Sequence, residues 1–141
     1  MPDTPDQLVR RWFEEVWNQG REETIDNLLA PAAKLYGLPT PDNRPLTGPN
    51  EFKPFFRRFR TAFPDIRVTV LRTVTEDDLV AVHYQVKGTH QGDALGFAST
   101  GRAVEFSGIS IARIAPDQIA EGWNLVDFLT CYQQLGVLPQ L

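Results

Sequence analysis

The sequence predicts an α+β domain in which a curved antiparallel sheet wraps over helices from the first half of the chain. Two observations support this prediction. Apolar residues recur at helical spacing up to Phe63. From Ile66 onward they alternate with polar residues, and this period of two is typical of strands with one solvent-exposed face. Helices followed by a run of long antiparallel strands are typical of α+β folds. A curved sheet that does not close leaves a cavity between itself and the helices.

The first helix is expected over residues 4–19. Thr4 and Gln7 have the spacing of a capping box, and Pro5 suits the first helical position because its missing N–H would have no partner there. Leucine, tryptophan, phenylalanine and valine then follow at helical spacing. Gly20 ends the helix, since glycine readily adopts the left-handed conformation found after helix ends.

A short second helix is expected around residues 25–29, where isoleucine and leucine share one side. Pro31 is expected to stop it, because proline lacks the N–H that the helix needs. Residues 32–38 are then expected to form a short strand. The proline-rich residues 39–50 form a loop, either a rim or lid or simply surface.

The third helix is expected to have an aromatic inner face, because its phenylalanines recur at helical spacing. They are Phe52, Phe55, Phe56, Phe59 and Phe63. Pro54 is tolerated near the first turn if Asn50 is the N-cap, and it kinks the helix if the helix begins earlier. The arginines of this segment mostly occupy its outer side, where a solvated face is expected. They are Arg57, Arg58 and Arg60.

The second half of the chain is predicted to be mostly strand. Residues 66–75 and 80–87 form an antiparallel hairpin with one wet face, and residues 92–100 form a loop. A long strand follows over residues 102–115, in which Gly108 marks a bulge or bend. Residues 118–127 form the last strand. A closing helix over Phe128 to Leu135 ends at Gly136.

Length and charge narrow the class of protein. The 141 residues fit a single domain, expected to span residues 1–141. Fourteen Lys and Arg against eighteen Asp and Glu give a formal charge of −4, whereas binding to nucleic acid needs a basic footprint. No apolar run reaches the roughly 18 residues of a membrane span, and the N-terminus lacks a secretory signal. We therefore expect a cytoplasmic protein with neither nucleic-acid nor membrane partners.

Several kinds of chemistry lack their sequence signatures. Cys131 is the only cysteine, which excludes an internal disulfide and a cysteine-based zinc cluster, and a structural thiol is expected there. The chain contains no Gly-rich phosphate loop, no zinc-binding histidine pair and no serine nucleophile elbow. The sequence therefore predicts neither a metal nor a cofactor.

Six short segments, taken in their order and at their separations, indicate a family resemblance. They are WNQG at residues 17–20, AFPD at 62–65, GTHQG at 88–92, TGR at 100–102, EGWN at 121–124 with Asp127, and QQLG at 133–136. Together they resemble the SnoaL-like polyketide cyclase or ester cyclase family of the nuclear transport factor two-like superfamily. The resemblance covers nearly the whole chain. It is more specific for the family than for an activity, because one fold hosts many functions.

The resemblance implies a cone-shaped α+β barrel of cystatin-like type, usually a homodimer through the sheet, with a deep apolar pocket at its open end. Characterised cyclases of the family close a ring by intramolecular aldol condensation without metal or cofactor. An aspartate near the end of the last long strand is their general acid/base, and the matching residue here is Asp127. The same fold also hosts isomerases, dehydratases, epoxide hydrolases and modules without chemistry.

The residues themselves give Asp127 two interpretations. Asp127 shares one face of the expected strand with Trp123 and Leu125, and because that face is mostly apolar we expect it to point inward. Burial there would raise the pKa of its carboxyl and suit a base that removes a proton beside a carbonyl. Asp127 also directly precedes a predicted helix, where aspartate is a favoured N-cap. The resemblance favours the pocket role.

Two further residues are candidates for polarising a substrate oxygen. His90 follows the apolar face of residues 82–86, so it could point into the cavity and stabilise an enolate; alternatively it is a loop histidine bonded to backbone. Tyr36 stands before Gly37, where related sequences often carry histidine. A phenol can donate a hydrogen bond to a substrate oxygen but is a poor base at neutral pH. The alternative is a core tyrosine with a satisfied hydroxyl.

Five aromatic residues are expected in the core and, where a cavity exists, on its wall as substrate-binding residues. They are Trp123, Phe56, Phe59, Phe106 and Trp12. Asn124 lies on the opposite strand face from Trp123, so it reaches the pocket only if a bulge shifts the register. Glu121 is expected at the exposed rim of its strand.

The first hypothesis is therefore a cofactor-independent enzyme for a small or medium apolar carbonyl compound, catalysing aldol-type cyclisation or isomerisation. Asp127 moves the proton, and His90 and Tyr36 polarise an oxygen. One alternative is a dimeric ligand-binding module without catalysis, which a collapsed cavity would favour. Another is an epoxide hydrolase-like or dehydratase-like enzyme, and a second buried carboxylate or an arginine beside Asp127 would favour hydrolysis.

Overall fold

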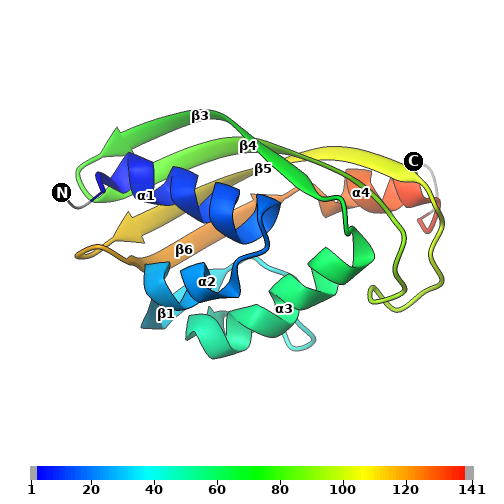
Figure 1. Ribbon diagram of the computed structural model, residues 1–141, viewed down its shortest axis with the longest axis horizontal. Helices are drawn as coiled ribbons and strands as arrows, with labels where there is room; N and C mark the ends of the chain where they lie inside the picture. The colour runs from blue at the N-terminus through cyan, green and yellow to red at the C-terminus, as the bar shows by residue number, and fades with distance from the viewer. Residues whose placement is uncertain (1–2, 139–141) are drawn as a thin grey trace.

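The computed structural model describes residues 3–138. Its elements, in chain order, are α1 (Pro5–Arg11), the π-helix η1 (Trp12–Asn18), α2 (Glu22–Leu28), β1 (Leu29–Tyr36), β2 (Leu46–Thr47), α3 (Gly48–Ala62), β3 (Arg67–Glu76), β4 (Leu79–Thr89), β5 (Ala103–Ile114), β6 (Ile119–Val126) and α4 (Phe128–Leu135). Helices α1, α2 and α3 cover one side of a curved sheet, and α4 lies at its end (Figure 1). The α+β expectation is confirmed.

The sheet has the strand order β2-β1-β6-β5-β4-β3. Neighbouring strands are antiparallel except β1 and β6, which run parallel, so the expectation of an entirely antiparallel sheet is wrong at this pair. The hairpin of β3 and β4 and the long strand β5 are found where expected. The inner face of the sheet packs on the helices (Figure 1) and carries the buried side chains of β4 and β5 in strict alternation.

The first helix begins as its sequence predicts. The Thr4 side chain accepts the Gln7 backbone N–H, and the Gln7 side chain accepts the Thr4 backbone N–H, which completes the capping box. After α1 the helix continues with the wider π-helical spacing of η1. It ends at Gly20, which has φ +70°. Asn18, at the end of η1, bonds both backbone groups of Val68 on β3, with distances of 2.9 and 2.6 Å.

Two boundaries in the first half differ from the predictions, and both involve proline. Strand β1 begins at Leu29, so Pro31 lies inside the strand and does not end the helix. It falls where the β1–β6 pairing shifts register, between Leu29 and Lys34, a place where a missing N–H is tolerated. Helix α3 begins at Gly48, with Thr47 as N-cap rather than Asn50, so Pro54 lies inside the helix.

Gly108 does not mark a bulge. It pairs regularly with Tyr84 on β4 and with Val126 on β6. A Cβ atom at Gly108 would lie 2.5 Å from the Tyr84 hydroxyl oxygen and 2.6 Å from Cζ. The glycine therefore provides the space in which the Tyr84 ring lies across the inner face of β5.

The closing helix begins and ends as predicted. Asp127 is the N-cap of α4, and Gly136 follows with φ +76°. The Gln134 side chain accepts the Glu105 backbone N–H at 2.7 Å and donates to the Glu105 carbonyl at 2.9 Å. It therefore holds α4 against the part of β5 that β6 does not reach. Within residues 3–138, no helix has the length and hydropathy of a membrane span.

Candidate functional site

A cavity of about 110 Å³ lies between the inner face of the sheet and the helices. Its wall is almost entirely apolar and includes Trp12, Phe13, Phe55, Phe59, Val82, Phe106, Val126 and Phe128. A cavity of ~150 Å³ with an apolar wall is known to hold benzene, so this one suits a group of at most about one aromatic ring. Six lining residues keep some exposure: Trp17, Leu38, Ile111, Asn124, Val126 and Phe128. Three of them, Leu38, Val126 and Phe128, lie where the parallel strands β1 and β6 end, and we call these three residues the mouth.

Three polar side chains on the cavity wall form one hydrogen-bonded chain. Ser110 Oγ donates to Asn124 Oδ1 at 2.8 Å, and Asn124 Nδ2 donates to the Tyr36 carbonyl at 2.9 Å. The Tyr84 hydroxyl lies 3.2 Å from Ser110 Oγ. Because the single Ser110 proton is used on Asn124, the Tyr84 hydroxyl is the donor to Ser110. Asn124, Ser110 and Tyr84 project from three adjacent strands, β6, β5 and β4.

The Tyr84 hydroxyl is the member of this chain best suited to meet a ligand. Its bond to Ser110, at 3.2 Å, is long for a hydroxyl pair, so its proton can turn to a ligand oxygen at little cost. Burial raises the pKa of Tyr84, and the hydrogen bond to Ser110 opposes the rise. The phenol is therefore neutral at physiological pH and acts as a hydrogen-bond donor.

Asp127 does not have the surroundings that its strand pattern suggested. Its side chain is exposed and caps α4, accepting the Thr130 backbone N–H at 3.0 Å and the Thr130 hydroxyl at 2.6 Å. These bonds lower its pKa, because they stabilise the carboxylate. The expected inward orientation and raised pKa are wrong, and the N-cap interpretation is confirmed. The acid/base role of Asp127 stays a prediction.

The error concerns which face of β6 is inside. Trp123 and Leu125 point to the outer face of the sheet, where the Trp123 ring stacks on Tyr36 with centroids 6.1 Å apart. Gly122, Asn124 and Val126 line the cavity instead. Asn124 therefore reaches the cavity without the register shift that was expected to be necessary. Neither Trp123 nor the Tyr36 side chain is among the lining residues.

The remaining aromatic predictions fall into two groups. Trp12, Phe59 and Phe106 are buried and line the cavity, as expected, and their role in binding stays a prediction. Phe56 is also buried, but it lies behind the wall, with its ring 5.4 Å from Trp17.

His90 is fully buried and lies outside the cavity wall. Its Nδ1 accepts the Thr100 backbone N–H at 3.0 Å, and its ring is flanked by Phe63 and Phe97, with centroids 5.7 and 5.2 Å away. Its Nε2 has no hydrogen-bond partner within the described residues. The backbone-bonded interpretation of His90 is confirmed. The imidazole joins the two ends of the loop between β4 and β5.

The other candidates are accounted for by local contacts. Burial, together with the charge of Asp127, raises the pKa of the Cys131 thiol to about 12, so that thiol is unreactive at neutral pH. Glu121 lies at the strand rim, 3.7 Å from the Arg113 guanidinium. Among residues 3–138, no three histidine, cysteine, aspartate or glutamate side chains gather as a metal site would require.

The structure thus does not bring Asp127, His90 and Tyr36 together, and it reveals a different polar group that the sequence did not single out. A signal for Tyr84 was present: it alternates with Val82 and Val86 on the apolar face of its strand. Ser110 interrupts the apolar face of β5 in the same way. A hydroxyl on an otherwise apolar strand face marks a polar contact inside a core.

Comparison with solved structures finds many proteins with the same fold, among them the following. IdmH from Streptomyces antibioticus, a candidate polyketide cyclase, is 29% identical; the match covers 96% of this chain and all of IdmH, with a TM-score of 0.83. A candidate SnoaL-like polyketide cyclase from Jannaschia sp. CCS1 is 22% identical over 96% of this chain and 93% of that one, with a TM-score of 0.84.

A third structure, from Catenulispora acidiphila, is a protein with a ketosteroid isomerase-like fold. It is 14% identical over 96% of each chain, with a TM-score of 0.77, and shows likeness of fold alone. A search of curated proteins found no significant match.

The family model of the SnoaL-like polyketide cyclases matches residues 7–135, which is most of the chain. Together with the similarity to IdmH, this match supports a cyclase- or isomerase-type role. The fold, the apolar cavity between helices and sheet, and the family match all agree. The chain therefore belongs to the SnoaL-like polyketide cyclase family.

Proposed function

We propose that this protein is a cofactor-independent enzyme that binds an apolar carbonyl compound in the cavity and promotes aldol-type ring closure or a related isomerisation. The observation that carries the proposal is the Tyr84–Ser110–Asn124 chain on an otherwise apolar wall. A single donor in an apolar cavity fixes one substrate oxygen and favours negative charge on it. The family match supports the same kind of role.

In the proposed reaction the Tyr84 hydroxyl donates to the substrate carbonyl oxygen. A base removes the proton from the neighbouring carbon, and the electron pair of that C–H bond forms an enolate whose oxygen Tyr84 stabilises. The enolate carbon then forms a C–C bond with a second carbonyl of the same substrate. The alkoxide so produced takes back the proton from the protonated base, so no other reactant is consumed.

We propose Asp127 as the base. Its two chain neighbours, Val126 and Phe128, both belong to the mouth of the cavity. The hydrogen bonds from Thr130 lower its pKa and so weaken it as a base while it caps α4. Because Thr130 holds both carboxylate oxygens, Asp127 must turn from Thr130 toward the mouth before it can take a proton. Turning away gives up two hydrogen bonds and the helix cap, a cost of about 1 kcal/mol at this exposed site.

Proton exchange into a simple ketone tests this proposal without knowledge of the natural substrate. In D₂O the protein is expected to accelerate deuterium uptake at the benzylic carbon of phenylacetone, measured by proton NMR against buffer. Asp127→Asn is expected to abolish the acceleration and leave thermal unfolding nearly unchanged, because asparagine caps helices as well as aspartate. Asp127→Ala, which loses the cap as well, is expected to cost about 1 kcal/mol of stability.

Full exchange activity in Asp127→Asn would show that Asp127 is a cap only and would overturn its role as base. If the wild-type protein binds phenylacetone but gives no exchange above buffer, the enzymatic proposal fails. The protein would then be a ligand-binding module without catalysis. One observation favours that second function: within residues 3–138, no carboxylate or imidazole lines the cavity. The same residues contain no arginine paired with Asp127, the feature that would have favoured hydrolysis.

We also propose that two copies of the chain associate through the outer face of the sheet. Apolar side chains meet there across β5 and β6, where Ile109 pairs with Leu125 and Ile111 with Trp123. Leu125 is 79% exposed and Ile109 53% exposed, although both lie in the middle of the sheet. Adjacent exposed apolar side chains of this kind are typical of an association surface.

The expected result is a dimer in light scattering after size-exclusion chromatography, converted to a monomer by Leu125→Glu, because a charge would be buried without a partner. Asn50→Glu places the same charge at an exposed position of α3, away from the outer face of the sheet, and is expected to leave the dimer intact. A monomeric wild-type protein at high micromolar concentration, or a Leu125→Glu dimer, would contradict the proposal.

A further inference from the structure

The three arginines of α3 differ in their ion-pair and hydrogen-bond partners. Arg57 forms a two-point pair with Glu22, with distances of 3.0 and 2.6 Å, and Arg60 donates to the Trp17 carbonyl at 2.7 Å. Arg58 has neither an ion pair nor a hydrogen bond within the described residues, although it is partly buried. The expectation of one solvated arginine face therefore describes Arg58 poorly.

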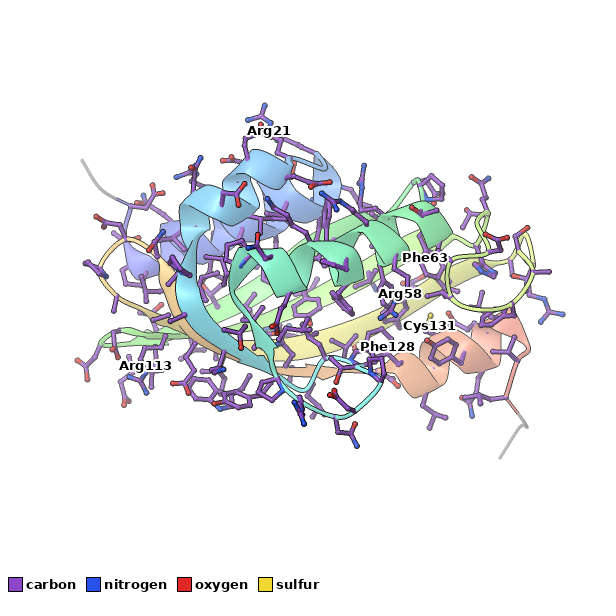
Figure 2. The ribbon with its side chains drawn as sticks, turned by 90° about the horizontal axis from the view of Figure 1, so that it is seen from below. Arg21, Arg58, Phe63, Arg113, Phe128 and Cys131 are labelled. Carbon is purple, nitrogen blue, oxygen red and sulfur yellow. The ribbon has the colours of Figure 1, made fainter. Side chains whose placement is uncertain are left out.

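Arg58 is not itself a lining residue, but it contacts two residues of the cavity wall. Its guanidinium carbon is 6.0 Å from the ring centroids of both Phe55 and Phe59, which line the cavity. The Phe59 ring in turn lies 5.5 Å from Phe128 at the mouth. Figure 2 shows Arg58 leaving α3 toward α4, on the side where Phe128 and Cys131 lie, whereas Arg21 and Arg113 project from other parts of the surface.

The charge of Arg58 is not neutralised by α4. That helix contains no acidic residue, and the carboxylate of its N-cap, Asp127, bonds Thr130 instead. The guanidinium carbon lies over two aromatic rings, and no acceptor within the described residues takes its N–H groups, so these groups can donate to a ligand. A guanidinium edge matches the two oxygens of a carboxylate in geometry and charge.

We propose that Arg58 binds a carboxylate carried by the substrate, so that the ligand is an apolar acid whose carbon skeleton fills the cavity and whose charge stays at the mouth. This inference rests on the proposed function for the cavity and adds the substrate class. The rings of Phe55 and Phe59 line the cavity on one side and contact the Arg58 guanidinium, so an acid bound by Arg58 stays next to a skeleton bound in the cavity. Arg58 therefore selects the substrate and sets its direction, with the uncharged end innermost.

Two compounds of nearly equal shape test the charge alone: 3-phenylpropanoate and 3-phenylpropanamide, titrated by isothermal calorimetry. The wild-type protein is expected to bind the carboxylate at least about 10-fold more tightly, as expected for a charge-assisted bidentate contact. Arg58→Gln is expected to remove this preference and leave the amide affinity unchanged. Arg57→Gln, whose side chain is paired with Glu22 away from the cavity, is the matched control and is expected to keep the preference.

Equal affinity for the two compounds in the wild-type protein would overturn the carboxylate site while leaving the cavity as a binding site. A preference that persists in Arg58→Gln, or disappears in Arg57→Gln, would also overturn it. Inorganic phosphate is expected not to displace 3-phenylpropanoate, and displacement would indicate a general anion site instead. If neither compound binds, both the acid site and the proposed ligand cavity fail. Deuterium uptake by phenylacetone, which has no charge, tests the catalytic proposal independently.

Discussion

Replacing Tyr84 with phenylalanine is expected to slow deuterium uptake by phenylacetone about 100-fold, because a single donor to a developing oxyanion contributes roughly that much. The ring and its contacts stay, including the Phe13 ring with its centroid 4.8 Å away. The affinity for phenylacetone should therefore change little, and the loss should fall on the rate at saturation. The lost bond to Ser110 is expected to cost about 1 kcal/mol of stability.

The two tyrosines considered for this role give opposite expectations. The Tyr36 ring stacks on Trp123 at the outer face of the sheet, so Tyr36→Phe should leave the exchange rate at the wild-type value if Tyr84 is the donor. A large loss in Tyr36→Phe with normal exchange in Tyr84→Phe would assign the role to Tyr36, as the sequence suggested. A Tyr84→Phe protein with full activity would remove the hydroxyl chain from the mechanism.

Adding one methyl group at Gly108 is expected to displace the Tyr84 ring. The new Cβ would stand 2.5–2.7 Å from three atoms of the Tyr84 side chain, which is buried and packs against the Phe13 ring, so the Tyr84 ring would have to move into the cavity. Overpacking of this kind costs typically about 1–3 kcal/mol. Chemical denaturation should show this loss of stability, and binding of 3-phenylpropanamide should weaken because the ring would be pushed from its place on the cavity wall.

Gly122→Ala is the matched control, since it adds the same methyl group on the neighbouring strand. Its nearest contact is the end of the flexible Leu35 side chain at 3.0 Å, so a smaller loss is expected. Combining Gly108→Ala with Tyr84→Leu should recover part of the stability, because leucine lacks the atoms that overlap. If Gly108→Ala is as stable as the wild-type protein and binds equally well, the role assigned to Gly108 is wrong.

Periodicity predicted most of the fold because each element has one buried side. The capping box at Thr4, the phenylalanine stripe of α3 and the glycine after α4 each depend on local chemistry and are found as expected. Pro31 was misinterpreted because proline is a helix breaker in isolation, whereas the irregular pairing of β1 with β6 tolerates it inside a strand. That pairing joins residues about 90 positions apart in the sequence, which no local pattern reveals.

The candidate site was predicted less well, for a physical reason. The more apolar face of β6, with Trp123 and Leu125, was taken as the inner face. In the folded chain that face is outside, and the inner face carries Gly122, Asn124 and Val126. An apolar strand face does not have to point into the core, because it can also lie on the outer side of the sheet as an association surface. The sequence pattern also could not predict the pairing of Gly108 with Tyr84, because the side chain that requires a glycine at position 108 lies on another strand.

The side-chain amides of Asn18 and Gln134 have a consequence for the behaviour of the whole chain in solution. Asn18 occupies the open edge of β3, and Gln134 occupies the stretch of β5 that β6 leaves uncovered. Each amide takes up one backbone donor and one acceptor, as an additional strand would. Free edges of this kind recruit strands from other molecules and start aggregation. Two of the short segments that mark the family thus contain residues that keep the sheet from growing.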